Sequence, residues 1–344
     1  MTRCRVLVVE DSPTTRDYVV QLIESAPGLR VVETAGDGAE AIEKTVRLKP
    51  DVILMDVHMP HLDGFTATRR IMERAPTPIV LMSASLERDE VVLTFEALDA
   101  GAVTVVHKPP GPGDPRQAEA VRELLETLRL MAEVKVVRRW PPRKPSPRAG
   151  PGGGDHVRVI AIGASTGGPP VLAEILRDLP RDFGAPILVV QHIAAGFTEG
   201  FVEWLGGQTA LAVKLAEDGE PVRAGSVYVA PEGLQMELDP RGRVRLAVHV
   251  AQDGFRPSVS HTFASLAATH GRSAMGVLLT GMGRDGAGGL RRLHEAGAVT
   301  VAQSEATSVV FGMPGEAVRM QAAQHVLSPS EIAGLMQALA GEKP

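Results

Sequence analysis

The chain has 344 residues, of which 44% are hydrophobic and 3% aromatic, and its formal net charge is −5. This length predicts two domains, and the low aromatic content predicts that their cores are aliphatic. The negative charge argues against partners such as nucleic acid or an anionic membrane surface. A single cysteine, Cys4, excludes an intrachain disulfide. No stretch approaches the ~18 apolar residues of a membrane span, and the first apolar run ends at Glu10-Asp11, too early for a signal peptide. We therefore expect a cytoplasmic protein without membrane insertion.

Residues 1–125 alternate short apolar runs with apolar residues at helical spacing. Five such repeats predict a (βα)5, flavodoxin-like domain, a parallel sheet with helices on both faces. The expected strands are residues 6–9, 31–32, 52–55, 79–82 and 103–106.

Polar side chains stand where these strands end. The residues are Glu10, Asp11, Asp56, Ser83 and Lys108. In an open parallel sheet the carboxyl ends of the strands form the binding edge. Three carboxylates repel one another without a cation, and their hard oxygens suit Mg²⁺. A carboxylate beside Mg²⁺ and a lysine can attack phosphorus. Any one of these residues alone would be interpreted as an ordinary loop residue. The five together favour a site that binds Mg²⁺ and accepts a phosphoryl group.

These residues, with the segments Met55–Pro60, Asp63-Gly64 and Lys108-Pro109, make residues 1–125 resemble a response-regulator receiver domain. The resemblance implies phosphorylation of Asp56 by a histidine kinase, which the resemblance of the second domain described below identifies as a chemotaxis histidine kinase. It implies Mg²⁺ held by Asp11, Asp56 and the backbone carbonyl of His58, with Glu10 contributing through water. It also implies that Ser83 and Lys108 bind the phosphoryl oxygens.

Two positions depart from that family. Glu10 stands where many receivers have aspartate, which keeps the charge on a longer side chain. Val105 stands where many have an aromatic switch residue. We therefore expect the switch to differ from the usual one or to depend on Ser83 alone.

Residues 126–155 are predicted to be a linker. They include the Pro-, Arg- and Lys-rich run 138–148 and the glycines 152–154, which cannot form a core. The basic run could contact an acidic surface, but a solvated tether is favoured.

Residues 156–344 predict a second domain, a doubly wound, mostly parallel α/β fold. Strands are expected at 159–162, 187–190, 227–230, 275–280 and 299–301, and an antiparallel hairpin at 236–238 and 244–246. Helices are expected at 171–179, 201–205, 263–268, 287–296 and 332–339.

The first of these strands ends in a small-residue turn, Gly163–Gly168, that carries Ser165 and precedes Pro169-Pro170 at the start of a helix. Backbone N–H groups at a helix N-terminus stabilise negative charge. The turn therefore suits either a bound phosphate or a nucleophilic serine with an oxyanion hole.

Two further strand ends carry His192 and Asp285, so a serine, a base and an acid are predicted to meet at one sheet edge. Each residue alone has an ordinary structural explanation, as a helix cap or a core histidine, but jointly they favour catalysis.

Dinucleotide binding is the competing interpretation. It is poor because the turn lacks the second fingerprint glycine and no acidic residue ends the next strand.

Residues 156 to about 340 resemble the catalytic domain of chemotaxis protein-glutamate methylesterases. The matching segments are Ile162–Pro169, Val190–His192, Ala230-Pro231, Arg256–Val259, Leu279–Gly286 and Phe311–Pro314. The resemblance implies hydrolysis of γ-glutamyl methyl esters on chemoreceptors, with release of methanol, and deamidation of receptor glutamines. Ser165 would attack, His192 would be the general base and Asp285 would orient it. The N–H groups of Met282 and of Thr166 would form the oxyanion hole.

One departure is Ser260-His261, where that family often has aspartate after Pro-Ser-Val.

The esterase chemistry implies no cofactor. The resemblance also implies that the unphosphorylated receiver blocks the catalytic mouth, and that phosphorylation of Asp56 relieves the block. A different class of function, a switched binding module on an inactive hydrolase scaffold, is disfavoured because Ser165, His192 and Asp285 are all present.

Overall fold

The computed structural model describes residues 3–83, 88–134, 157–249 and 254–340. The chain divides into two compact units, residues 1–141 and 142–344. None of the helices in these described segments is long and apolar enough to cross a membrane.

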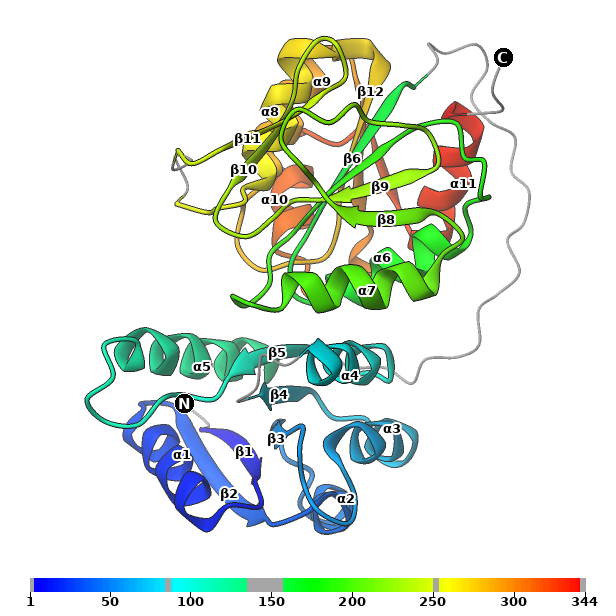
Figure 1. Cartoon of the computed structure of the whole chain (residues 1–344). Coiled ribbons are helices and arrows are strands. Elements are labelled where there is room, and N and C mark those ends of the chain that lie inside the picture. The colour runs from blue at the N-terminus through cyan, green and yellow to red at the C-terminus, as the bar shows by residue number, and fades with distance from the viewer. Residues whose placement is uncertain (1–2, 84–87, 135–156, 250–253, 341–344) are drawn as a thin grey trace. The chain divides into compact units, whose positions relative to one another are not determined.

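The N-terminal unit is a five-stranded sheet with strand order β2-β1-β3-β4-β5, and the strand pairs are parallel (Figure 1). Its strands are β1 (Cys4–Val9), β2 (Leu29–Ala35), β3 (Val52–Asp56), β4 (Ile79–Ser83) and β5 (Thr104–His107). Its helices are α1 (Pro13–Ser25), α2 (Gly38–Leu48), α3 (Gly64–Arg74), α4 (Arg88–Asp99) and α5 (Gln117–Met131). Strands β3 and β4 are buried along their whole length, as expected when helices cover both faces. This confirms the predicted (βα)5 fold.

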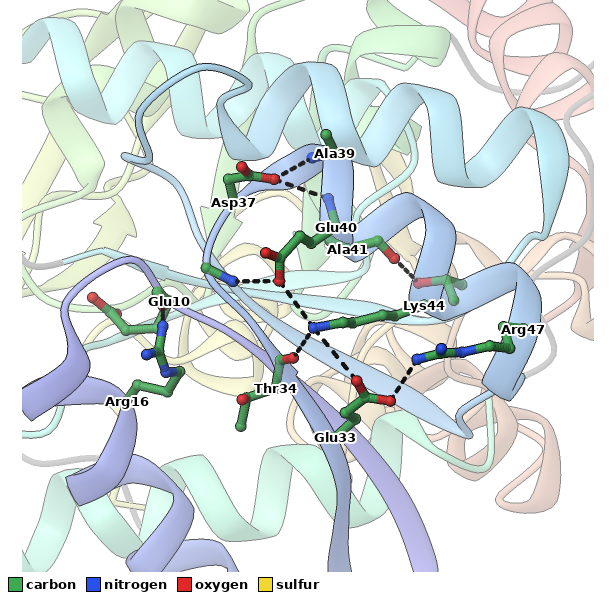
Figure 2. A network of polar contacts seen from close by, with 12 residues as sticks. Glu10, Arg16, Glu33, Thr34, Asp37, Ala39, Glu40, Ala41, Lys44 and Arg47 are labelled. Carbon is green, nitrogen blue, oxygen red and sulfur yellow. Dashed lines mark hydrogen bonds and ion pairs between the residues drawn. The ribbon is translucent and has the colours of Figure 1, made fainter.

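A polar network ties β2 to α2 (Figure 2). Lys44 Nζ donates to the Thr34 carbonyl at 2.7 Å and to Glu40 Oε2 at 2.9 Å, and Arg47 donates to Glu33 at 2.7 Å. Exposed ion pairs of this kind stabilise a fold by at most about 1 kcal/mol each. Lys44 also bonds a strand carbonyl, so the network holds the second half of α2 against β2.

The C-terminal unit is built on a seven-stranded sheet with the order β14-β13-β12-β6-β7-β9-β8, and its strand pairs are parallel. The strands are β6 (Val159–Ala164), β7 (Ile187–Gln191), β8 (Ala212–Leu215), β9 (Ser226–Val229), β12 (Ala274–Leu278), β13 (Val299–Gln303) and β14 (His325–Leu327). A separate antiparallel hairpin is formed by β10 (Gln235–Leu238) and β11 (Val244–Ala247). The chain runs outward from β6 in both directions, so β6 marks the switch point where α/β sheets bind ligands.

Helices cover this sheet on both faces (Figure 1). They are α6 (Gly168–Arg177), α7 (Thr198–Gln208), α8 (Val259–Thr269), α9 (Ala287–Glu295), α10 (Met313–Arg319) and α11 (Pro329–Ala340), with two short 3₁₀ turns at Gly271–Ser273 and Glu305–Thr307. α8, α9 and α10 pack together, and α6 packs with α7 and α11. The aliphatic core predicted from composition is present, with Leu266, Leu290 and Leu293 fully buried. The doubly wound, mostly parallel fold is confirmed.

Two strands and one α-helix of the C-terminal unit were not predicted. β8 and β14 are short strands at the two edges of the sheet, and their side chains are only partly buried or exposed. They therefore lack the continuous apolar run that marks a central strand. α10 has only seven residues and begins next to Pro314, too short for a visible helical period.

The proposed domain limits, 1–125, 126–155 and 156–344, stay predictions. α5 continues to Met131, beyond residue 125. The predicted linker lies outside the described residues from 135 onward, and so does its basic run 138–148.

Candidate active site and phosphorylation site

Ser165, His192 and Asp285 follow three adjacent strands of the C-terminal sheet. Ser165 comes directly after β6, His192 directly after the neighbouring β7, and Asp285 in the turn between β12 and α9. The main chain keeps the first two loops side by side, because the His192 N–H donates to the Ala164 carbonyl at 2.9 Å. The turn that carries Ser165 needs glycine at position 167, where φ is +76°. The three residues therefore follow adjacent strands at the same edge of the sheet, and their joint role as a catalytic triad stays a prediction.

Gln191 forms hydrogen bonds to the backbone of both the serine and the histidine. Its side-chain Nε2 donates to the Ser165 carbonyl at 2.9 Å and to the His192 carbonyl at 2.8 Å. The side chain is buried, with 6% of the residue exposed. Because one rigid amide bonds both carbonyls, the two loops are held at a set separation.

His192 and Asp285 form a pair. His192 Nε2 lies 3.0 Å from Asp285 Oδ2, at ion-pair distance but off the line of a hydrogen bond. The side chains are 13% and 1% exposed. Phe255 stacks on the imidazole with ring centroids 4.6 Å apart and planes 8° from parallel. The ring is thus positioned by the carboxylate at its edge and by an aromatic face.

Asp285 is held at the start of α8. Its oxygens accept hydrogen bonds from the N–H groups of Val259 (2.8 Å), Ser260 (2.9 Å) and Gly286 (2.8 Å), and from the Ser258 hydroxyl (3.1 Å). Burial opposes ionisation of this carboxyl. The charge of His192 and the hydrogen bonds from Ser260 outweigh it, and they hold the pKa of Asp285 well below its usual range. The acid therefore stays ionised beside the imidazole.

The nucleophile candidate lies against a glycine loop. A side chain at Gly281 would come within 2.7 Å of the Ser165 Cβ and collide with the Met313 sulfur. The Gly281 N–H donates to the Val310 carbonyl at 3.1 Å, and its carbonyl accepts from the Met313 N–H at 2.9 Å. The Phe311–Pro314 motif thus shapes the loop that passes Ser165.

The predicted oxyanion donors lie at this loop and at the serine turn. Among the residues the structure describes, the N–H groups of Thr166 and Met282 donate no hydrogen bond to protein atoms. Likewise, no hydrogen bond joins the Ser165 hydroxyl to His192 within those residues. Met282 is 40% exposed, so it lies in a surface loop.

The N-terminal unit gathers a second set of charged groups at the ends of β1, β3 and β5. The carboxylates of Glu10, Asp11 and Asp56 have ligand atoms within 4.8 Å of one another. Lys108 Nζ lies 2.6 Å from Asp56 Oδ2 and 2.9 Å from Glu10 Oε2. Ser83, the last residue of β4, is buried. The His58 N–H donates to Asp56 Oδ1 at 3.3 Å.

The charge balance of this cluster leaves room for a cation. Burial raises the pKa of both Glu10 and Asp56, and Lys108 lowers it only in part, through its charge on both carboxylates and its hydrogen bond to Asp56. Glu10 Oε2 is buried and its contact with Lys108 is not aligned as a hydrogen bond. Three carboxylates with oxygen atoms this close match the hard-oxygen donor set of Mg²⁺.

Sequence reasoning missed the residues that support the candidate triad. Gln191 was recognised only as part of a strand end, and Phe255 and Ser258 were given no role at the site. Ser258 had a visible signal, since serine before an apolar helical run is a typical N-cap, and it caps α8 through the His261 N–H at 3.3 Å. The Phe255 stack had none, because no periodic pattern places a loop residue over an imidazole.

A family model described as CheB methylesterase matches residues 160–336, and one described as response regulator receiver domain matches residues 6–122. A protein of Geobacter metallireducens named protein-glutamate methylesterase/protein-glutamine glutaminase 4 is 46% identical over 98% of this chain and 99% of its own length. A Hahella chejuensis protein, named as number 3 of the same kind, is 48% identical over 97% of this chain and 98% of its own length.

Among solved structures, the CheB methylesterase catalytic domain of Thermotoga maritima superposes with a TM-score of 0.51 at 37% identity. It covers 53% of this chain and 98% of that domain. Both resemblances inferred from the sequence motifs are confirmed by these matches. The chain belongs to the CheB methylesterase family, a family of hydrolases, and carries an N-terminal response regulator receiver domain.

Proposed function

We propose that Ser165, His192 and Asp285 hydrolyse γ-glutamyl methyl esters on chemoreceptor cytoplasmic domains and deamidate receptor glutamines. The observation that supports this proposal is that the three residues follow adjacent strands of one sheet, with His192 Nε2 3.0 Å from the buried carboxylate of Asp285. The relatives bear the names of both activities.

The Ser165 hydroxyl attacks the γ-carbonyl carbon while His192 takes its proton. Because Nε2 of His192 faces Asp285, Nδ1 is the nitrogen left to act as the base. The negative oxygen of the tetrahedral intermediate accepts from the N–H groups of Met282 and Thr166. The imidazolium then gives its proton to the leaving group, which departs as methanol from an ester or as ammonia from a glutamine. Water, activated by His192, hydrolyses the acyl-serine to glutamate and free Ser165.

The serine and the imidazole are not hydrogen-bonded in the free enzyme, and catalytic hydrogen bonds often tighten only when substrate is bound. We expect substrate to close this gap. Gln191 holds the backbone of both loops through the Ser165 and His192 carbonyls.

The receiver is proposed to regulate this reaction through phosphorylation of Asp56 by a chemotaxis histidine kinase. Mg²⁺ would be held by Asp11, Asp56 and the His58 carbonyl, with Glu10 acting through water. When bound, the ion neutralises charge on the phosphoryl group being transferred. Lys108, already 2.6 Å from Asp56, and Ser83 would bind the phosphoryl oxygens. We place the enzyme in the cytoplasm, where this kinase and the receptor's signalling domain meet.

The test is methanol release from methylated receptor membranes. Ser165→Ala should reduce turnover by roughly 10³-fold or more, because it removes the nucleophile. Labelling by a fluorophosphonate should occur in the wild type and be absent from the variant. A folded Ser165→Ala protein that releases methanol at the wild-type rate would refute the assignment. A wild type that binds receptor but neither reacts with the probe nor releases methanol would instead support an inactive binding module.

A further inference from the structure

A group of three metal-binding side chains lies outside both sites described above. It consists of Glu237 on β10, His249 two residues beyond β11, and His261 in the first turns of α8. Their ligand atoms all lie within 4.8 Å of one another. Among the described residues, the other such group is the carboxylate cluster of the receiver, which contains no histidine. The Glu237–His249–His261 group is called the histidine cluster below.

Two members of the histidine cluster are held in place by the fold. Glu237 lies between Met236, whose carbonyl accepts from the Thr262 hydroxyl at 2.8 Å, and Leu238, whose N–H donates to the Ser265 hydroxyl at 3.0 Å. The strand that carries Glu237 and the helix that carries His261 are thus bonded on both sides of the pair. His261 needs no rearrangement to meet Glu237, and a site built on rigid elements binds with little ordering cost.

The separations fit a tetrahedral ion. Glu237 Oε1 lies 2.6 Å from His261 Nε2 and 3.7 Å from His249 Nε2. Ligands at about 2.0 Å from a tetrahedral zinc lie about 3.3 Å from one another. The two distances to Glu237 Oε1 fall on both sides of that value and each differs from it by less than 1 Å, and all three ligand atoms lie within 4.8 Å of one another. The two imidazoles meet edge to face, with centroids 4.7 Å apart and planes at 66°, which lets both Nε2 atoms approach the same oxygen.

A hydrogen bond alone accounts for only part of this arrangement. Glu237 and His261 satisfy each other at 2.6 Å without a third residue. His249, whose side chain is 52% exposed, nevertheless directs its Nε2 to the same carboxylate oxygen. Two imidazoles and one carboxylate are the ligand set of many zinc sites, with a water completing the coordination.

We infer that the histidine cluster binds Zn²⁺, or a dication of the same borderline class, through Glu237 Oε1, His249 Nε2 and His261 Nε2. The ion cross-links the β10–β11 hairpin to α8. It lies on the helix whose first residues hold Asp285, but it takes no part in the ester chemistry, and its binding is independent of Ser165.

The experiment is a Zn²⁺ titration of the untagged full-length protein after removal of metals with EDTA. Millimolar Mg²⁺ is present throughout, so that the receiver carboxylates are occupied. The wild type should bind one Zn²⁺ per chain, and its melting temperature should rise with Zn²⁺ because the ligand binds the folded state. Co²⁺ in place of Zn²⁺ should give the visible absorption of a histidine-ligated, low-coordinate ion.

Variants identify the ligands. His249→Ala removes a half-exposed ligand and should fold normally. Loss of a residue that only hydrogen-bonds to a metal ligand typically weakens metal binding by roughly 10–100-fold. His249→Ala should weaken Zn²⁺ binding by more than this. His261→Asn tests the second imidazole. His325→Ala, which changes a partly buried histidine on β14, and Ser165→Ala should bind like the wild type. Binding of equal strength by His249→Ala and His325→Ala, or no Zn²⁺ binding by the wild type, would overturn the inference.

Discussion

Asp285 illustrates how a single residue links structure and chemistry in this domain. Its two oxygens accept from three backbone N–H groups and one hydroxyl, and the same carboxylate faces the His192 ring. Charged hydrogen bonds of this kind are about twice as strong as neutral ones. The residue therefore anchors the start of α8 and sets the orientation of the proposed base at once.

We predict that Asp285→Asn lowers the turnover number by roughly 10³–10⁴-fold, because the amide cannot hold the imidazole in the correct tautomer or stabilise its positive form. The amide also cannot accept all the N–H bonds, so the unfolding midpoint in urea should fall. Methanol release and urea unfolding measure the two effects. Asp239→Asn, a change at the β10–β11 turn, should leave turnover unaltered; equal losses in both variants would contradict the role given to Asp285.

At the scale of elements, the N-terminus of α8 is where stability should depend on acid. The pKa of Asp285 is lower in the folded state than its usual value, so its ionised form stabilises the fold. That contribution is fully present above the unfolded pKa of about 4 and is lost as the pH falls below it. The wild type should therefore be more stable than Asp285→Asn at pH 6, and the difference should shrink toward pH 3. Urea unfolding of both proteins across this range is the measurement; a pH-independent difference would contradict the prediction.

The loop after β12 is the second element whose shape matters. Gly281→Ala places a methyl group 2.7 Å from the Ser165 Cβ, so the serine turn must move. A displacement of about 1 Å can cost about 10²-fold in rate, and we expect kcat/KM to fall by that order. Gly288→Ala is the matched control, since nothing lies within 4 Å of the added atom and the residue is in α9. It should keep activity and stabilise the protein by about 0.5–1 kcal/mol.

The elements that could be predicted are those with strong periodic or apolar signals. β6, β7 and β12 are buried along their full length, and their polar end residues identify the sheet edge on which Ser165, His192 and Asp285 meet. The support of that edge could not be predicted. Gln191 bonds carbonyls on two separate loops, and Phe255 reaches His192 from a distant turn. Such contacts depend on tertiary geometry, which spacing along one chain does not contain.

At the scale of the whole molecule, two α/β units of similar construction carry different chemistry: phosphoryl groups at one and acyl groups at the other. Asp56→Asn should abolish stimulation of methanol release by a small-molecule phosphodonor such as acetyl phosphate, so that the ratio of rates with and without donor is one. Asp17→Asn, at an exposed position on α1, should retain the wild-type ratio. Persistent stimulation of the folded Asp56→Asn protein would refute phosphorylation at Asp56.

The receiver should also be stabilised by Mg²⁺. Burial raises the pKa of Glu10 and Asp56 in the folded state, so their ionised forms destabilise the fold at neutral pH, and a bound dication relieves this. At 100 times its dissociation constant the ion would add about 2.7 kcal/mol. Melting curves of the full chain should show a transition that shifts upward with Mg²⁺ and back with EDTA. Sodium chloride at the same ionic strength should not reproduce the shift.

Gln191 has one more consequence, for an enzyme whose relatives are named as glutaminases. Gln191 Nε2 donates to the Ser165 and His192 carbonyl oxygens at 2.9 and 2.8 Å. Hydrolysis of the Gln191 side-chain amide would replace this nitrogen with an oxygen that faces the same two carbonyl oxygens. Each such loss leaves a buried group unsatisfied at a cost of about 1–3 kcal/mol. The product of self-deamidation would therefore push apart the loops of Ser165 and His192. An enzyme that ages by this route would lose activity with a mass gain of about one dalton.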